Sequence, residues 1–408
     1  MSVAFDADVT LTLSVAFTSD PLDTSPTWKD VSSDLRGLTT FRGRNNFRDV
    51  VQTGTASFTL DNTSGAYDPS HTSGVNYPNV LPMRPIRLQA VHDTVTYDLF
   101  RGFVQNWNQE YPNQIDAEVR IDCVDAFFFL SMLKATSTES SELSSVRVGN
   151  LLDDAGWPAG DRDIGTGDVT LMGYAADCQP VLGLLQQVEK TEGGLFFMAG
   201  DGDATFQEQT HRAGLSVTAE FGDSGVTADD LANSVADSTS WSGWVTGRTW
   251  TSHGASMDVS ATAELPYRDV EISYNMDQVF NKVDVVPYFG LPSTDSDATS
   301  ITAYGSRLLR IYDTLQNSIP DAEAHAATML ARFKDPKVNV ERLSFMPQRL
   351  EASLWPRAFD ELSTKYTVLR RPPAGNVIEQ DVYLEGVRHQ ADARSKTWTT
   401  TFELSQWD

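Results

Sequence analysis

The chain has 408 residues, and its 40% hydrophobic and 10% aromatic side chains are enough for packed cores, which excludes a chain that is disordered throughout. Because one core rarely grows beyond roughly 250–300 residues, we expect about two to four domains. The formal net charge of -25 argues against a surface that binds nucleic acid or an anionic membrane, since such surfaces need clustered lysines and arginines. The acidic excess serves solubility, or it keeps a surface from adhering to DNA.

Two cysteines, Cys123 and Cys178, are too few for a disulfide scaffold, and we expect both to be buried free thiols. The first residues lack the positive and apolar stretches of a signal peptide. No 18-residue apolar run is present, so the sequence predicts no membrane span. These features favour a protein that is made and folded in a bacterial cytoplasm.

Alternating polar and apolar residues predict five strands in the first third of the chain. Each run has the period of two that is typical of a half-buried strand. The predicted strands are 9–17, 55–62, 85–91, 97–104 and 117–123. Short strands with turn residues between them favour a small sandwich or barrel.

The pattern then changes to helical spacing. Asp125 is a good N-cap for a short helix over 127–133. The Ser/Thr/Glu-rich stretch 135–145 predicts a linker, and we place a domain boundary there. A helix over 147–155 follows, with Gly156 at its C-terminal end.

A second helix is predicted over 180–190, with proline in its first turn and one apolar face. After it, 195–198 and 204–208 predict a hairpin around Gly200-Asp201-Gly202-Asp203. A helix followed by a hairpin indicates an α+β unit.

Residues 221–262 are rich in Ser, Thr, Asp and Gly and predict an irregular β region. Trp241, Trp244 and Trp250 lie in it, either packed under loops or forming an aromatic ligand surface.

The last third returns to strands, with one helix that is capped by Asp321 and stopped by Pro336. The predicted strands are 270–274, 281–286, 338–345, 364–369, 382–390 and 397–404. The chain is therefore predicted to be mainly β with an α+β insert. Two β-domains, 1–135 and 266–408, flank a mixed middle region, 136–265.

No residue pattern predicts a catalytic, cofactor or metal site. Asp201-Gly202-Asp203 resembles the start of a calcium loop but lacks the later ligands, so a hairpin turn is favoured. The histidines have no metal-ligand spacing; they are His71, His92, His211, His253, His325 and His389. The acidic pairs Asp153-Asp154 and Glu189–Glu192 are interpreted as solvated helix surface rather than glycosidase carboxylates. We expect no enzymatic activity.

One segment is distinctive: Arg42-Gly43-Arg44-Asn45-Asn46-Phe47-Arg48-Asp49, followed by 53–69. It resembles the N-terminal region of minor tail proteins of long-tailed actinobacterial phages. Further segments fit the same resemblance, namely 99–104, 122–126, 189–197, 278–285, 383–389 and 398–404. The order of these segments carries the resemblance, which spans most of the chain apart from roughly 215–265.

That family is similar to the baseplate hub of tailed phages. The resemblance implies two tube-like barrels per chain, and a homotrimer whose six barrels continue the sixfold tail tube at the tail tip of the virion. It also implies distal tail proteins, and a tape measure protein, as partners, with DNA passing through the lumen.

Two alternatives stay open within the tail and one outside it. A distal tail ring or peripheral carbohydrate-binding baseplate protein would have one barrel and an appended module, whereas two internally similar β-domains favour the hub. A tail-tip enzyme that degrades the cell wall belongs to another class. The sequence does not separate a phage from a phage-related injection machine.

Overall fold

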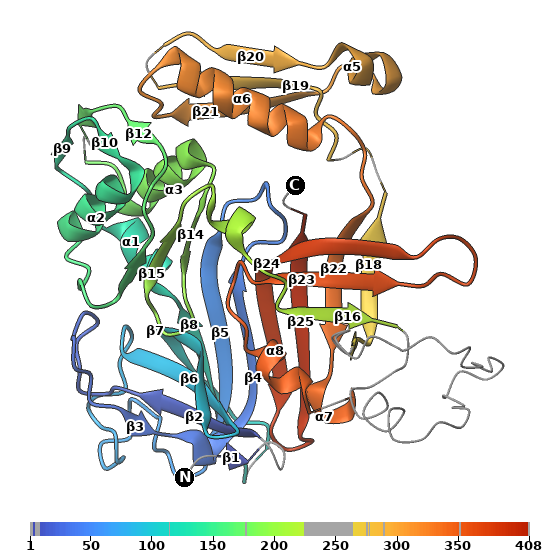
Figure 1. Ribbon diagram of the computed structural model, residues 1–408. Coiled ribbons are helices and arrows are strands. Elements are labelled where there is room, and N and C mark those ends of the chain that lie inside the picture. The colour runs from blue at the N-terminus through green and yellow to red at the C-terminus, as the bar shows by residue number, and fades with distance from the viewer. Residues whose placement is uncertain are drawn as a thin grey trace.

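The computed structural model describes residues 3–4, 9–113, 115–175, 178–223, 264–274, 276, 278–288, 290–350 and 352–406. It is mainly β with a few helices and a large mixed sheet, which confirms the predicted fold class (Figure 1). None of the helices in the described ranges is long and apolar enough to cross a membrane.

The strands outside the middle region fall into two sets. The first set is β1 (Val3–Ala4), β2 (Val9–Val15), β3 (Lys29–Asp30), β4 (Leu35–Gly43), β5 (Gln52–Asp61), β6 (Pro85–His92), β7 (Val95–Glu110) and β8 (Glu118–Val124). The second set is β16 (Ala219–Gly222), β17 (Leu265–Pro266), β18 (Asp269–Ser273), β22 (Asn339–Phe345), β23 (Lys365–Arg370), β24 (Ile378–Asp392) and β25 (Thr397–Ser405).

These two sets repeat one strand order. In the first set the pairs are β3-β2, β2-β6, β6-β7, β7-β8, β8-β5 and β5-β4. In the second set the pairs are β17-β16, β16-β23, β23-β24, β24-β25, β25-β22 and β22-β18. Taken in chain order, each strand from β2 to β8 corresponds to one strand of the second set, and β1 has no counterpart among the described strands. We call β2–β8 the first repeat, and β16–β18 with β22–β25 the second repeat.

The long strands β7 and β24 show the correspondence in detail. Each bends through a bulge in its pairing with the next strand, between Val104 and Asn106 in β7 and between Leu384 and Gly386 in β24. A bulge bends its strand and increases the local twist, so the two halves of one long strand can belong to two different sheet layers. Two pairings differ between the repeats: β2 is antiparallel to β6 and to β3, whereas β16 is parallel to β23 and to β17.

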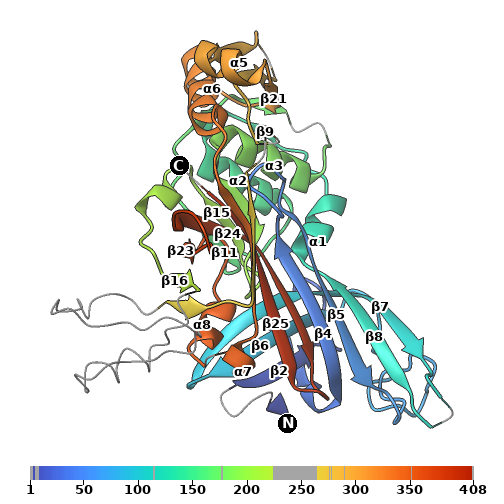
Figure 2. The ribbon, with the colours of Figure 1, turned by 90° about the vertical axis from the view of Figure 1, so that its right-hand side faces the viewer.

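Each repeat packs two layers against each other. In the second repeat, Phe221 of β16 lies 5.5 Å from Phe345 of β22, and Tyr366 of β23 stacks 5.6 Å from Phe402 of β25, as ring-centroid distances. In the first repeat, Phe58 of β5 meets Phe100 of β7 edge-on. Figure 2 shows β4, β5 and β25 in front of β2 and β6.

The predicted strands and helices of the first repeat and of the middle region are mostly confirmed, with small shifts of their ends. The middle elements are α1 (Ala126–Met132), β9 (Thr138–Glu139), β10 (Glu142–Leu143), α2 (Ser144–Asp154), β11 (Arg162–Ile164), β12 (Thr170–Leu171), β13 (Tyr174–Ala175), α3 (Val181–Glu192), β14 (Leu195–Met198) and β15 (Ala204–Gln207). Asp125 caps α1 through the amide of Phe127, and β14 and β15 form the predicted hairpin.

The predicted linker 135–145 is instead packed against α2. Its carboxylates Glu139 and Glu142 lie 3.9 and 2.6 Å from the guanidinium of Arg147, which is fully buried on α2. The linker interpretation is therefore wrong, because a polar composition conceals the pairing of these acids with a buried cation. The division at 1–135, 136–265 and 266–408 stays a prediction.

A small α/β unit is inserted between β18 and β22. It contains β19 (Lys282–Pro287), β20 (Ser293–Ser296), α5 (Ala298–Tyr304), β21 (Leu308–Thr314) and α6 (Ile319–Phe333). We call it the satellite unit (Figure 1, top). Its core is separate from the main one and packs α6 against Val283 and Val285. Asp321 is not the cap of α6: Ser318 is, and its hydroxyl accepts from the amide of Asp321.

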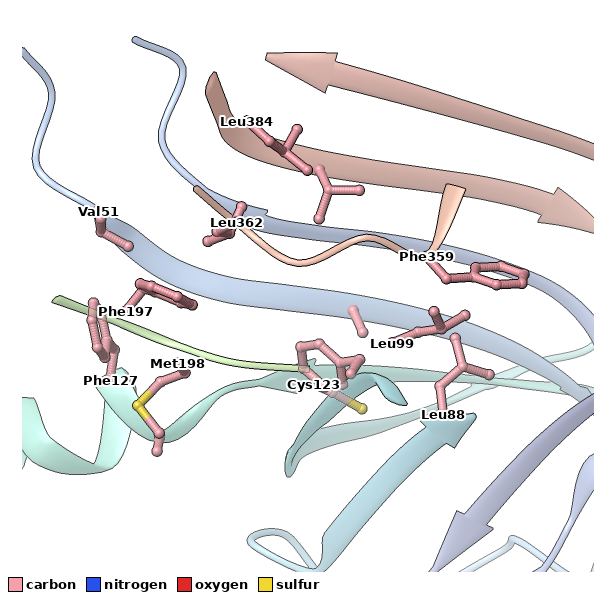
Figure 3. Packing of buried hydrophobic residues seen from close by; sticks show 14 of the residues in the cluster. Val51, Leu88, Leu99, Cys123, Phe127, Phe197, Met198, Phe359, Leu362 and Leu384 are labelled. Carbon is pink, nitrogen blue, oxygen red and sulfur yellow. The ribbon is translucent and has the colours of Figure 1, made fainter. Parts of the chain in front are cut away.

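One hydrophobic core runs through both repeats and the middle region. Figure 3 shows Leu88 and Leu99 of the first repeat together with Phe197 and Met198 of the middle hairpin and Leu384 of the second repeat. Two short helices, α7 (Pro347–Leu350) and α8 (Leu354–Ala358), follow β22, and α8 adds the buried Trp355. Two 3-10 turns, Ser32–Asp34 and His211–Gly214, complete the elements of the described part of the chain.

Candidate functional site

The two repeats meet along one strand pair. Residues Gly37–Gly43 of β4 pair with Gly386–Asp392 of β24 in antiparallel register. At one end, Gly43 has φ +101, and a Cβ there would lie 2.2 Å from the carbonyl oxygen of Glu385. Only glycine fits this close approach. The junction therefore joins the repeats edge to edge into one continuous sheet.

A buried charge network lies at this end of the junction. Glu385 of β24 accepts from Arg44 at 2.7 Å and from Arg212 of the middle region at 2.5 and 3.2 Å. All three side chains are buried. Burial raises the pKa of Glu385, but Arg212 and Arg44 overcome it and hold that pKa at about 2. The carboxylate thus stays ionised between two cations that come from different parts of the chain.

Glu189 of α3 completes the network. Its carboxylate lies 3.8 Å from Arg44, and it is buried. Burial raises the pKa of Glu189 to about 7, against the opposing charge of Arg44. The interpretation of Glu189 and Glu192 as surface is wrong. Glu192 is buried too, where it accepts from the amides of Asp168 and Val169.

The spacing of residues along α3 could have predicted the burial of Glu189 and Glu192. Glu189 follows Leu185 by four residues and Glu192 follows Val188 by four, so both continue the apolar stripe. An acid on the stripe of a helix is buried and needs a partner. The partners Arg44, Arg212 and Glu385 are distant in sequence and gave no local signal.

Arg42, two residues before Arg44, makes a second connection. It donates to Glu361 at 2.7 Å, to the carbonyl of Leu99 at 3.0 Å and to the carbonyl of Met198 at 3.3 Å. These acceptors belong to the second repeat, the first repeat and the middle hairpin. The segment that carries the resemblance therefore supplies the arginines that join all three parts.

The same segment holds the satellite unit. Phe47, in the β4–β5 connection, lies 5.9 Å from the ring of Phe333 of α6. The guanidinium groups of Arg44 and Arg332 lie 5.1 and 4.8 Å from its ring centroid. Such cation–π contacts stabilise by about 0.5–1 kcal/mol each when exposed. Phe47 thus attaches the satellite unit to the junction.

A groove of about 330 Å³ opens beside Phe47, between the satellite unit and the ends of β22 and β25. Its charged lining is mixed: Arg48, Arg332, Lys337 and Arg342 with Glu271, Asp335, Glu341 and Glu403. Opposite charges interspersed in this way select neither an anion nor a cation. The groove therefore does not define a ligand class.

One face of the continuous sheet is polar. A cross-strand row of polar side chains crosses six strands, and its members are Asn106, Asp122, Ser57, Thr39, Gln390 and Thr399. The adjacent row is apolar and faces the core: Trp107, Ile121, Phe58, Leu38, Ala391 and Trp398. Two arginines of the polar face form ion pairs, Arg120 with Glu110 and Asp122, and Arg342 with Glu271 and Glu403. A third, the exposed Arg388, lies over the ring of Phe41 at 4.7 Å.

The structure brings none of the predicted candidate residues into a catalytic arrangement. Asp201-Gly202-Asp203 is a hairpin turn with Gly202 at φ +94. Asp153 and Asp154 are exposed on α2, as predicted. Among the residues with described positions, no three His, Cys, Asp or Glu side chains gather as metal ligands. His253, Trp241, Trp244 and Trp250 lie outside the described residues.

The two cysteines differ in exposure. Cys123 is buried in β8, and burial raises the pKa of its thiol well above the ordinary value. Cys178 is exposed, so the prediction of two buried thiols is wrong for this residue. It stands in a turn at φ +58, outside the apolar surroundings that bury a thiol.

The fold has counterparts among solved tail proteins. The tail protein from Neisseria meningitidis MC58 is 11% identical with a TM-score of 0.59, covering 98% of this chain and 96% of that chain. The 43 kDa tail protein of prophage MuSo2 from Shewanella oneidensis is 10% identical with a TM-score of 0.57, covering 98% of both chains. No family model and no curated protein sequence matches the chain. At these identities the similarity shows a shared fold, that of phage tail proteins, over nearly the whole chain.

Proposed function

We propose that this chain is a structural component of a phage tail tip, a hub in which three copies extend the tail tube. The observation that carries the proposal is the repeated strand order, joined edge to edge at β4 and β24. Two similar β units per chain are what a hub needs, whereas a ring protein with an appended module needs one. The likeness in fold to two tail proteins supports the same assignment.

The placement of the insertions supports an adaptation from sixfold to threefold symmetry. The sheet has a period of one repeat, because both repeats contribute equivalent strands. The satellite unit, in contrast, occurs once per chain. The first repeat joins β4 to β5 through the short stretch 44–51, whereas the second inserts the satellite unit between the equivalent strands β18 and β22. Three chains would then present six similar units inside and three satellite units outside.

The polar face of the sheet suits the wall of a passage. Short polar side chains, two ion-paired arginines and an arginine that packs on an aromatic ring offer little for a sliding polyanion to bind. More than half of the acidic excess of the chain lies in residues 136–265, which hold 20 acidic and 5 basic residues. We therefore assign the low adhesion of the passage to paired charges rather than to a net acidic lining.

The proposed partners are other copies of this chain, the distal tail proteins, and a tape measure protein, with DNA passing through the lumen. The proposed location is the tail tip of the virion, after synthesis in the host cytoplasm. The resemblance noted in the sequence is to tail proteins of actinobacterial phages, and an actinobacterial phage as the source is part of the proposal on that ground alone.

Imaging of the assembled particle tests this function. Three copies of the chain at the end of the tube are expected, with two repeats of each copy continuing the tube wall. Six copies would assign the chain to a ring protein, and absence of the chain from the particle would refute the proposal. A wall-digestion assay with purified protein separates the hub from a tail-tip enzyme, for which activity would be expected.

A further inference from the structure

The continuous sheet ends in two strand edges that have no partner among the described residues. At one end, β18 pairs only with β22. At the other end, β6 covers β7 from Val95 to Phe103, whereas Asn106–Glu110 pairs only with β8. Unpaired strand edges carry free backbone donors and acceptors and are templates for another chain.

The directions of these two edge strands are compatible. From β7 to β18 the order is β7, β8, β5, β4, β24, β25, β22 and β18, and every successive pair is antiparallel. The two end strands therefore run in opposite directions. When β18 of one copy is placed beside β7 of a second copy, the antiparallel alternation continues without interruption.

The junction inside the chain already shows such a contact. By strand order, β4 of the first repeat corresponds to β18 of the second, and β24 corresponds to β7. Since β4 pairs with the distal half of β24, the equivalent pair between copies is β18 with the distal half of β7. We propose that β18 of one copy pairs with the end of β7, Asn106–Glu110, and with the following Tyr111 in the next copy. This inference rests on the proposed function and names the edges through which copies meet.

Two rows of paired residues fix the register. Leu38 leads through Phe58 and Ile121 to Trp107. Val270 leads in the same way through Leu343 and Phe402 to Val387. Trp107 and Val387 each come one residue after the bulge of their strand, between Val104 and Asn106 in β7 and between Leu384 and Gly386 in β24. They are therefore equivalent positions, and so are Leu38 and Val270, three strands away.

The register of the internal junction then carries over. Leu38 pairs with Ala391, four residues after Val387. Its equivalent Val270 is therefore assigned the residue four positions after Trp107, which is Tyr111. Tyr111 is 67% exposed in the single chain, and Val270 is half-buried. Pairing would place this exposed ring on the apolar side of the neighbouring strand.

The same register sets Glu271 opposite Glu110 of the next copy. Each carboxylate brings its own arginine, since Glu271 lies 3.0 Å from Arg342 and Glu110 lies 3.5 Å from Arg120. The contact thus brings two ion pairs together rather than two bare carboxylates. It is a head-to-tail contact. Copies therefore close into a ring when the rotation that relates one copy to the next is a whole-number fraction of 360°.

Cysteine cross-linking of the full-length chain tests the assignment. In a Cys178→Ser background, Val270→Cys and Tyr111→Cys variants are mixed and oxidised, because facing residues of antiparallel strands have Cβ atoms about 4.5–5.5 Å apart. A covalent dimer is expected in the mixture and in neither variant alone. When both substitutions are in one chain, a closed ring of one size is expected. The control is Val95→Cys, at the exposed tip of the β6–β7 hairpin, which should not link to Val270→Cys.

A second measurement covers failure of the cysteine variants to fold. Tyr111→Lys is expected to abolish association in light scattering while the circular dichroism spectrum stays unchanged. Links that form equally with Val95→Cys, or Tyr111→Cys dimers that form alone, would overturn the edge assignment. Cross-linking at other positions in a tail tip with three copies would overturn it and leave the proposed function standing. If rings linked at Val270 and Tyr111 form but the chain is absent from tails, the edge assignment would stand and the proposed function would be refuted.

Discussion

Neutralising Glu385 should cost the protein a large part of its stability. The pKa of Glu385 is held at about 2 rather than 4.5, which corresponds to about 3 kcal/mol at 1.36 kcal/mol per pKa unit. Removing one partner from a buried ion pair typically costs about 3–5 kcal/mol, because it leaves an uncompensated charge. Glu385→Gln keeps the shape of the side chain but leaves Arg44 and Arg212 buried without their shared carboxylate. We expect destabilisation of about 3–5 kcal/mol.

The loss should depend on pH in a way that identifies the network. In Glu385→Gln, Glu189 loses a neighbouring negative charge, so its pKa should fall from about 7. Its carboxylate can then balance Arg44. The destabilisation should therefore be larger at pH 5.5 than at pH 8.5.

Urea denaturation followed by tryptophan fluorescence measures both effects, since Trp355 and Trp398 are fully buried. The matched control is Glu379→Gln on the same strand, where the side chain is exposed and a change within about 0.5 kcal/mol is expected. Equal midpoints for the two variants would refute the reasoning, and a loss that does not vary with pH would remove Glu189 from the network.

Three further perturbations test other parts of the junction. Glu189→Gln should stabilise the protein at pH 8 by up to about 3 kcal/mol and have little effect at pH 4.5. The reason is that the raised pKa of Glu189 makes the stability of the unchanged protein fall as the pH rises from 4.5 to about 7. Thermal melts of both proteins at the two pH values measure this difference. Gly43→Ala should cost about 1–3 kcal/mol in urea unfolding, because its Cβ meets the backbone of Glu385. Gly149→Ala in α2, with open space around it, should instead stabilise by about 0.5–1 kcal/mol, and similar losses for both would contradict the close approach. Phe47→Ala should lose about 2 kcal/mol of aromatic and cation–π contact and speed hydrogen exchange in α6, whereas Val50→Ala, exposed in the same connection, should not.

Most strands could be predicted because their alternation is local. The strand 118–124, for example, alternates accessible and buried residues from Glu118 to Cys123. β4 was missed because two bulges interrupt its pairing with β5, and because it buries Arg42, a residue type that normally indicates a surface. In β21, Leu308 and Tyr312 face outward, which weakens the alternation.

The network could not be predicted as a unit. Arg44 and Glu385 are 341 residues apart, and Arg212 and Glu385 are 173 apart. Pairing over such distances depends on how the repeats are placed, which no local spacing encodes. Two β-domains on either side of an α+β insert were expected from the residue pattern, and the resemblance implied that both are tube-like barrels. Their shared strand order appears only when each pairing is known.

The junction also sets an order of events during synthesis. At about 5–20 residues per second, the 341 residues between Arg44 and Glu385 take roughly 20–70 s to emerge from the ribosome. Throughout that interval β4 has no β24 to pair with, and its edge is as open as that of β18 in the finished chain. Nascent chains on one message could capture each other there. The final strands therefore complete the sheet and also end the period in which this chain is most exposed to misassembly.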